Sequence, residues 1–153
     1  MDLQHSSNTF TGLDEAHARF LRMHQELGLP AQHQPQPLGS ARAHARATWI
    51  RTEVDELVGA TGIVDQIDAL MDILSHVMGT LVEMGVPPGM PMTWVHESNL
   101  AKRWSDGQVR LDLDGKLLKP PGWKGPEEAI ARWLSEPSQQ NWDSKGNSPV
   151  GEM

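Results

Sequence analysis

Two acidic stretches decide the fold of this chain: Arg51-Thr-Glu-Val-Asp-Glu56 and, after a break at Thr61-Gly62, Asp65-Gln-Ile-Asp-Ala-Leu-Met-Asp72. Because a helix repeats about every 3.6 residues, Glu53 and Glu56 share one face of the first helix. By the same count, Asp65, Asp68 and Asp72 share one face of the second helix, but Asp65 lies a turn away and is not expected to be a direct metal ligand. The sequence therefore predicts an acidic stripe, made of Glu53, Glu56, Asp68 and Asp72, on two neighbouring helices.

The second acidic stretch is otherwise apolar, and its apolar side chains are expected to be buried: Ile63, Ile67, Leu70, Met71, Ile73 and Leu74. An unpaired carboxylate beside a core is costly, so the acidic stripe calls for a cation. The apolar surface of this helix is too large for the other helices of the same chain to bury. A second copy of the chain is therefore expected to pack against it.

The composition limits the possible functions. A chain of 153 residues allows one domain with a core. A net charge of −7 argues against binding to a nucleic acid polymer, although a nucleotide can still bind if a divalent cation screens its phosphates. No stretch approaches the roughly 18 apolar residues of a membrane helix, and the absence of cysteine fits a reducing cytoplasm.

Hydrophobic periodicity and terminating Gly or Pro residues predict a mostly α chain with five helices. The expected helices are Leu13–Leu27, Ala41–Ala60, Ile63–Met84, Thr93–Trp104 and Pro126–Leu134. Ser40 is expected to cap the second helix, and the segments 32–39 and 86–92 are expected to be loops.

The segment Gln108–Leu118 alternates apolar and polar residues around Asp114-Gly115, a pair typical of hairpin turns. A small β-hairpin is therefore expected near the C-terminus. Residues 13–134 are expected to form the domain, with a loosely ordered segment 1–12 before it and a flexible polar tail 135–153 after it.

The acidic stripe has two interpretations. Carboxylates from two antiparallel helices would form an all-oxygen pocket, which hard cations such as Mg²⁺ or Mn²⁺ prefer. A metal bound there would support attack of water on a phosphoryl centre. The alternative is a solvated helix face, the usual meaning of a charge run. The apolar residues around Asp68 and Asp72 favour the metal site.

These residues resemble the MazG-like all-α nucleoside triphosphate pyrophosphatases, whose signature is ExxE, a gap, then ExxD. The similarity extends to the phosphoribosyl-ATP-pyrophosphohydrolase-like branch and covers roughly residues 13–130. The matching segments are Arg46-Ala-Thr-Trp-Ile-Arg-Thr-Glu53, Asp68-Ala-Leu-Met-Asp72-Ile-Leu followed by Gly79-Thr80, Val95-His-Glu-Ser-Asn-Leu-Ala-Lys102, and Asp114-Gly-Lys116 with Lys119-Pro120 and Gly122-Trp123.

The resemblance implies that the helices form an antiparallel helical bundle. It also implies an enzyme that cleaves a (deoxy)nucleoside triphosphate to the monophosphate and pyrophosphate. Glu53, Glu56, Asp68 and Asp72 would hold Mg²⁺ or Mn²⁺, and Glu53 or Glu56 would orient the attacking water. Family members form homodimers or homotetramers with sites at the subunit boundary. Some phage members, the MazZ type, act on dGTP and GTP, which suggests these substrates and the cytoplasm of a bacterium or of a phage-infected host cell.

The sequence departs from the family pattern at three places. The second Glu of the signature is Ala69 here, so Asp68 must serve in its place. The usual Tyr after Asp-Ile-Leu is Ser75, followed by His76, and the Glu often found before Glu53 is Thr52. Four acidic residues remain to bind a metal, but the inner surface of the pocket differs from the one that the family pattern implies.

Four polar residues near the C-terminus are candidates for substrate binding. Asn99 and Lys102 lie three apart on one helix face, where they could contact ribose and phosphate, and the resemblance favours this over a plain polar surface. Lys116 and Lys119 are either phosphate contacts or ordinary edge lysines. Trp49 is a possible base-stacking residue, although core packing is favoured for it.

Two other functions remain open from the sequence. The chain could be a catalytically silent nucleotide-binding regulator that keeps the fold and has lost turnover through Ala69. It could also be a structural helical oligomerisation module, whose acidic residues form an ordinary solvated face.

Overall fold

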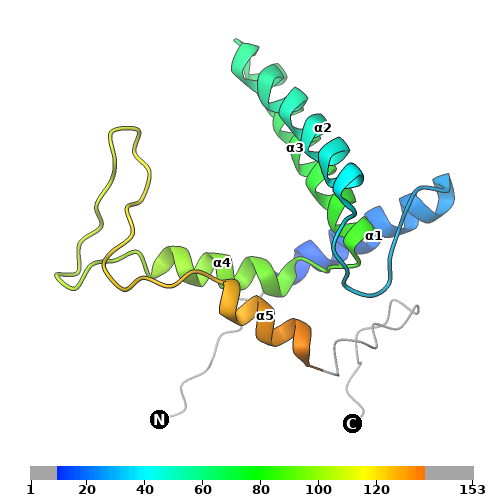
Figure 1. The fold of residues 1–153 in the computed structure, drawn as a ribbon. Coiled ribbons are helices and arrows are strands. Elements are labelled where there is room, and N and C mark those ends of the chain that lie inside the picture. The colour runs from blue at the N-terminus through cyan, green and yellow to red at the C-terminus, as the bar shows by residue number, and fades with distance from the viewer. Residues whose placement is uncertain (1–9, 137–153) are drawn as a thin grey trace, which may run out of the picture.

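The structure is a computed structural model that describes residues 10–136, and it is built from helices (Figure 1). The helices are α1 (Thr11–Leu27), α2 (Ser40–Gly59), α3 (Ile63–Met84), α4 (Gly89–Leu100) and α5 (Glu127–Ser135). The mostly α class is confirmed. The expectations for residues 1–9 and for the tail from residue 137 lie outside the described residues. Among residues 10–136, no helix is long and apolar enough to cross a membrane.

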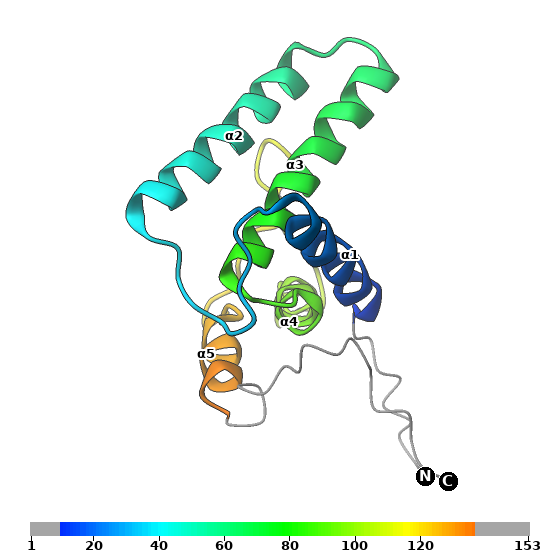
Figure 2. The ribbon, with the colours of Figure 1, turned by 90° about the vertical axis from the view of Figure 1, so that its right-hand side faces the viewer.

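The helices form a projecting pair on a base. α2 and α3 run antiparallel side by side and project from the rest of the chain (Figure 2). α1 packs across α3 and also touches α4, and α5 packs against α4. No contact between helices of the described chain joins α4 to α2 or α3. The expected antiparallel packing is therefore present in the α2–α3 pair, and α4 and α5 lie apart from it.

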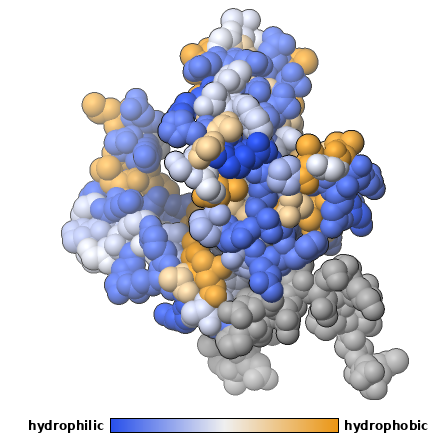
Figure 3. All heavy atoms as spheres, turned by 45° about the vertical axis from the view of Figure 1, so that its right-hand side comes forward, coloured by the Kyte–Doolittle hydropathy of each residue, from blue (hydrophilic) through white to orange (hydrophobic). Residues whose placement is uncertain are grey.

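The apolar core of a single chain is small. Among residues 10–136, its buried apolar residues are Ala69, Met78, Val82 and Trp133. The prediction that the apolar residues of α3 are buried is wrong for one chain. Ile73 is half-buried, but the other five named residues are exposed: Ile63 70%, Ile67 52%, Leu70 46%, Met71 53% and Leu74 46%. Figure 3 shows orange hydrophobic side chains at the surface in several places, including this projecting pair.

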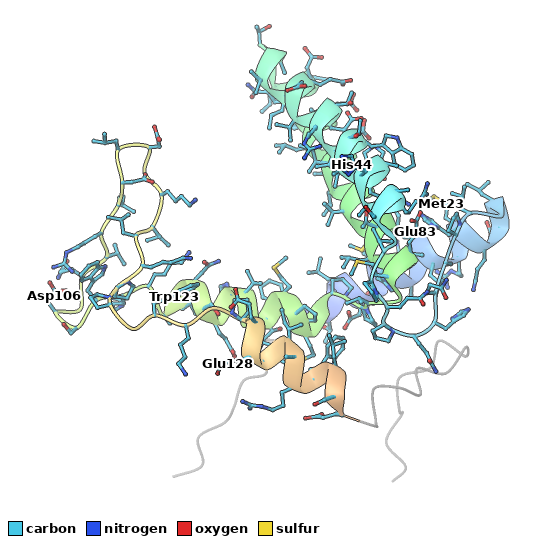
Figure 4. All side chains as sticks on the ribbon, viewed as in Figure 1. Met23, His44, Glu83, Asp106, Trp123 and Glu128 are labelled. Atoms are coloured by element: carbon cyan, nitrogen blue, oxygen red, sulfur yellow. The ribbon has the colours of Figure 1, made fainter. Side chains whose placement is uncertain are left out.

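A buried ion cluster joins α2 to the end of α3. Arg42 donates to Glu83 through Nε at 2.7 Å and through Nη2 at 2.5 Å. Arg46 Nη2 donates to the same carboxylate at 2.5 Å. The Glu83 side chain is 2% exposed, and its position on α3 can be followed in Figure 4. A charge buried this deeply requires its partners, so these three residues fix how α2 lies on α3.

The arginines control the ionisation of Glu83. Burial by itself would raise the pKa of this carboxyl. The hydrogen bonds from Arg42 and Arg46, together with their positive charges, outweigh burial and lower the pKa to about 2. Glu83 is therefore ionised throughout the ordinary pH range.

α4 begins earlier than its sequence predicts. The expected helix was 93–104, whereas the observed helix begins at Gly89 and ends at Leu100. The reason is a cap supplied by α1: the Gly89 N–H donates to Asp14 Oδ1 at 2.7 Å. A side chain at position 89 would collide with this carboxylate, because a Cβ there would lie 2.3 Å from Asp14 Oδ2. The distant Asp14 thus turns a Pro/Gly/Met segment into the first turn of a helix.

The expected cap of α2 is also different. Ser40 was predicted to occupy the N-cap, but it is the first residue of the helix. Gly39 occupies the N-cap, and no side-chain hydrogen bond caps this end. The loop 32–39 is confirmed as irregular, and the N–H groups of Gln32 and Gln36 bond it to the C-terminal end of α3.

Gly85 ends α3 and permits this loop to approach. It has φ 67°, the left-handed conformation that glycine adopts without strain. A Cβ at this position would lie 2.5 Å from the backbone oxygen of Gln34. Both constraints require glycine, and the predicted end of α3 is confirmed.

The expected β-hairpin is reduced to a loop. The chain reverses at Asp114-Gly115, and the Asp112 carboxylate accepts the N–H groups of Asp114 and Lys116 at 3.0 and 2.8 Å. Leu111 and Leu117 form a single antiparallel bridge. No strand forms among the described residues, because the two arms carry too few backbone pairs to extend the ladder.

Glu83→Gln should lower the free energy of unfolding by about 3 kcal/mol, because it leaves two buried or half-buried arginines without their counter-charge. Urea denaturation of the folded protein measures this. The control is Glu128→Gln, which removes an exposed ion pair with Lys124 at 3.6 Å and should cost less than about 1 kcal/mol. Equal losses in the two variants would contradict a structural role for the buried cluster.

The low pKa of Glu83 also predicts how stability depends on pH. Because the folded pKa of about 2 lies below the ordinary value of 4.5, the unfolded chain takes up this proton first. The contribution of Glu83 is present in full above pH 4.5 and is lost as pH falls from 4.5 towards 2. The wild type should lose more stability over this interval than Glu83→Gln does.

Candidate functional site

The acidic stripe lies on the α2–α3 pair. Glu53 is the most enclosed of its members, with a side chain 14% exposed. Glu56 on α2 and Asp68 and Asp72 on α3 are exposed to solvent. The helix pair therefore carries all four carboxylates, as the sequence predicts, but only Glu53 is held against neighbouring side chains.

His76 on the facing helix lies beside Glu53. His76 Nε2 lies 3.5 Å from Glu53 Oε1. The imidazole ring of His76 in turn packs against the indole of Trp49, with ring centroids 5.9 Å apart. The guanidinium groups of Arg42 and Arg46 each lie 5.0 Å from the Trp49 ring centroid. A continuous row of contacts thus connects the buried ion cluster to the first residue of the acidic stripe.

Trp49 is not the core residue that was favoured from the sequence. It is 39% exposed, and its ring covers the two arginines. No motif in the sequence indicates the contact between His76 and Glu53. His76 lies four residues after Asp72, so helical spacing puts both on one side of α3. That spacing was the signal that could have found it.

The structure places Ala69 in the core and Asp68 on the surface. Ala69 is 2% exposed. A glutamate side chain at this position would begin inside the packed core, whereas the carboxylate of Asp68 begins in solvent. On a helix, Asp68 and Ala69 lie on opposite sides of the direction of Asp72. Asp68 therefore offers a carboxylate beside Asp72, but from the outer side.

The donor atoms of the acidic stripe suit a hard divalent cation, since all are carboxylate oxygens. In the part of the chain from residue 10 to 136, no group of three His, Asp or Glu side chains is close enough to hold a metal ion. The stripe fits the cation in its chemistry, and its exposed members have room to turn towards one. The four-residue ligand set remains a prediction.

A second polar cluster lies at the far end of α4. The Nζ of Lys102 donates to Asn99 Oδ1 at 2.7 Å. The same ammonium group lies 5.5 Å from the ring centroid of Trp123, and the ammonium group of Lys119 lies 4.5 Å from it. Three of the four residues predicted to bind substrate, Asn99, Lys102 and Lys119, thus lie close to the single indole ring of Trp123.

Lys116, the fourth of these residues, lies elsewhere in the loop. It is exposed, and its backbone N–H bonds to Asp112 at the chain reversal. Among the described residues, it makes no cation–π contact with Trp123. Lys116 is therefore not one of the lysines that contact the Trp123 ring.

The acidic stripe and the basic cluster are separated within one chain. Figure 4 shows Trp123 at the outer end of α4, well away from His44 and Glu83 on the projecting pair. This agrees with the lack of packing between α4 and either α2 or α3 in the described chain. One chain thus carries an acidic stripe and a basic cluster that do not meet.

The sequence from residue 20 to 99 matches the family model of phosphoribosyl-ATP pyrophosphohydrolase, and this range spans more than half of the chain. It includes every residue of the acidic stripe. The chain belongs to the phosphoribosyl-ATP pyrophosphohydrolase family. The resemblance stated from the sequence motifs is confirmed, and the MazG-like all-α class is the fold of this family.

Among solved structures, the chain is similar to a candidate NTP pyrophosphohydrolase from Exiguobacterium sp. 255-15. The two share 26% sequence identity over 77% of this chain and 95% of the other, with a TM-score of 0.41. No curated protein matches the sequence. Membership of the phosphoribosyl-ATP pyrophosphohydrolase family supports a pyrophosphohydrolase that acts on a nucleotide.

Proposed function

We propose that this protein is a homo-oligomeric, metal-dependent nucleoside triphosphate pyrophosphohydrolase. It cleaves the bond between the α and β phosphates and releases a nucleoside monophosphate and pyrophosphate. The observation that carries the proposal is the family match over residues 20–99, which contains ExxE on α2 and the facing acids on α3. The presence of all four carboxylates on one helix pair supports it.

Each acidic residue has a proposed role. Glu53, Glu56, Asp68 and Asp72 would hold Mg²⁺ or Mn²⁺, which would screen the phosphate charge and lower the pKa of bound water. Glu53 or Glu56 would orient the attacking water. Glu53 suits this role better, because His76 and the row of contacts behind it restrict its carboxylate.

The separation of the acidic stripe from the basic cluster supports an assembly of two or four copies. A basic cluster that does not meet the acidic stripe of its own chain can meet the stripe of a second copy. The apolar side chains exposed on α3 and on the end of α2 give such a copy a surface to cover. We propose that the nucleotide lies between Asn99, Lys102 and Lys119 of one copy and the acidic stripe of its partner, with Lys116 at the periphery.

We propose dGTP and GTP as the preferred substrates. This rests on the resemblance to the branch that includes phage enzymes of the MazZ type. The exposed indole of Trp49, close to Glu53 through His76, would give a purine an aromatic surface on which to stack.

A catalytically silent nucleotide-binding regulator is the second candidate. One observation favours it: Ala69 is buried where the family has a metal-binding glutamate. Such a protein would bind nucleotide through its basic cluster without turning it over. No comparable observation favours the third candidate, a structural oligomerisation module.

Turnover of a panel of eight NTPs and dNTPs with Mg²⁺ or Mn²⁺ tests the enzyme directly. Chromatography should resolve a monophosphate and pyrophosphate, and Glu53→Gln should reduce the rate by about 100-fold because it removes a charged metal ligand. Asp55→Asn is the matched control, because Asp55 is an exposed acid on the opposite side of α2. Release of orthophosphate would contradict cleavage between the α and β phosphates, and nucleotide binding without turnover would favour the regulator.

The oligomeric state tests the assembly. Light scattering during size-exclusion chromatography should give the mass of a dimer or tetramer. Val58→Glu should shift the protein towards the monomer, because Val58 is 82% exposed in one chain and would bring a charge into the contact. Glu15→Lys, a charge change on the exposed side of α1, should leave the mass unchanged. A wild-type monomer at about 100 μM would rule the assembly out.

A further inference from the structure

Trp123 organises the basic cluster at the end of α4. We propose that Lys102, Lys119 and Trp123 form a binding site for the terminal phosphates of the triphosphate, the part released as pyrophosphate, and that Trp123 is a positioning residue for both lysines. The choice of ligand rests on the proposed function. The site itself rests on the geometry of these three residues.

Both ammonium groups lie within 5.5 Å of the same indole centroid. An indole face attracts a cation, which holds a long and flexible lysine in one place. Lys102 lies in the turn directly after α4, Lys119 lies in the longer loop that follows, and Trp123 is the residue that they share. Because they are this close to one ring, one polyphosphate group can contact both of them.

Trp123 is itself fixed. Its Nε1–H donates to the backbone oxygen of Ser98 at 2.7 Å, which ties the loop to the last turn of α4. Lys102 has a second restraint from Asn99 Oδ1 at 2.7 Å. A neutral amide can orient an ammonium group without cancelling its charge. The site is therefore restrained in position and retains two positive charges.

These positive charges lack acidic partners. Within residues 10–136, neither Lys102 nor Lys119 forms an ion pair with a carboxylate. The neighbouring stack of Arg110 on Trp104 is different. There the guanidinium lies 3.9 Å from the ring centroid and pairs with Asp106 at 3.0 Å. The Arg110 stack is neutralised, whereas two like charges lie at the single ring of Trp123, an arrangement that an anion stabilises.

The charge of the rest of the chain narrows the choice of ligand. The net charge is −7, so a free anion is not attracted to the surface in general. The acidic stripe repels phosphates unless a metal is bound to it. In the absence of metal, a polyphosphate should therefore bind at Lys102 and Lys119. Lysine suits it because the compact ammonium group is a strong point charge for phosphate oxygens.

Calorimetry with inorganic tripolyphosphate in EDTA tests the site on the whole protein without turnover. Lys102→Gln combined with Lys119→Gln should weaken binding by at least about 30-fold, since two charge-assisted contacts are lost. Trp123→Leu should weaken it by about fivefold, and Trp123→Phe should restore much of the loss because it keeps an aromatic face. Trp104→Phe and Lys124→Gln, which alter a different stack and an exposed lysine, should bind as the wild type does.

A kinetic readout separates positioning from a merely structural role. With the nucleotide that the wild type hydrolyses, Trp123→Leu should raise KM by about fivefold and change kcat by less than about twofold. Circular dichroism should show that the variants keep the helical content of the wild type. If Trp123→Leu does not fold, the double lysine variant decides, because its changes are confined to two polar side chains.

The outcomes for the site and for the enzyme can be told apart. Unchanged tripolyphosphate affinity in the double lysine variant overturns the site, even if the protein hydrolyses nucleotides. Equal affinities in Trp123→Leu and Trp104→Phe overturn the positioning role. A third combination is that the double lysine variant loses tripolyphosphate binding while the wild type hydrolyses none of the NTPs. That combination would support the phosphate site and contradict the proposed hydrolase activity.

Discussion

The buried carboxylate of Glu83 is the constraint on which the α2–α3 pair depends. It lies in the last turn of α3, where the helix dipole disfavours a negative charge, and Arg42 lies in the first turn of α2, where a positive charge is disfavoured. The antiparallel packing brings these two ends together. Each charge is then offset by its partner on the other helix, with Arg46 as a second donor. The pair is held at its base by an interaction that only this alignment satisfies.

From this base the helices carry the candidate catalytic residues outward. The indole of Trp49 lies beside the arginines, His76 beside the indole, and Glu53 beside the imidazole. These contacts order one carboxylate of the acidic stripe, and the other three remain solvated. The small core and the exposed apolar residues farther along the pair show that one chain alone stabilises this region weakly. An active assembly would have to supply both the missing apolar contacts and the basic cluster of a second copy.

Local signals in the sequence were sufficient for most of the fold. α3 has its predicted bounds because Gly62 and Gly85 break an otherwise continuous apolar pattern. The start of α4 was missed because its cap comes from Asp14, 75 residues away along the chain. Helical spacing placed Glu53, Glu56, Asp68 and Asp72 on neighbouring helices. The gathering of lysines on Trp123 and the contact of His76 with Glu53 depend on tertiary packing, which single-sequence periodicity does not describe.

The attachment of α2 and α3 at one end also has a mechanical consequence. A helix of 20 residues is about 30 Å long, so the pair is a lever with its pivot where α1 packs across α3. A tilt of about 5° at the pivot would move the tip at Thr61-Gly62 by about 2–3 Å. Glu53 and Asp72 lie part of the way along this arm, so they would be displaced by a smaller amount. Their distance from a nucleotide held by another copy would therefore be adjustable by a small rotation at the base.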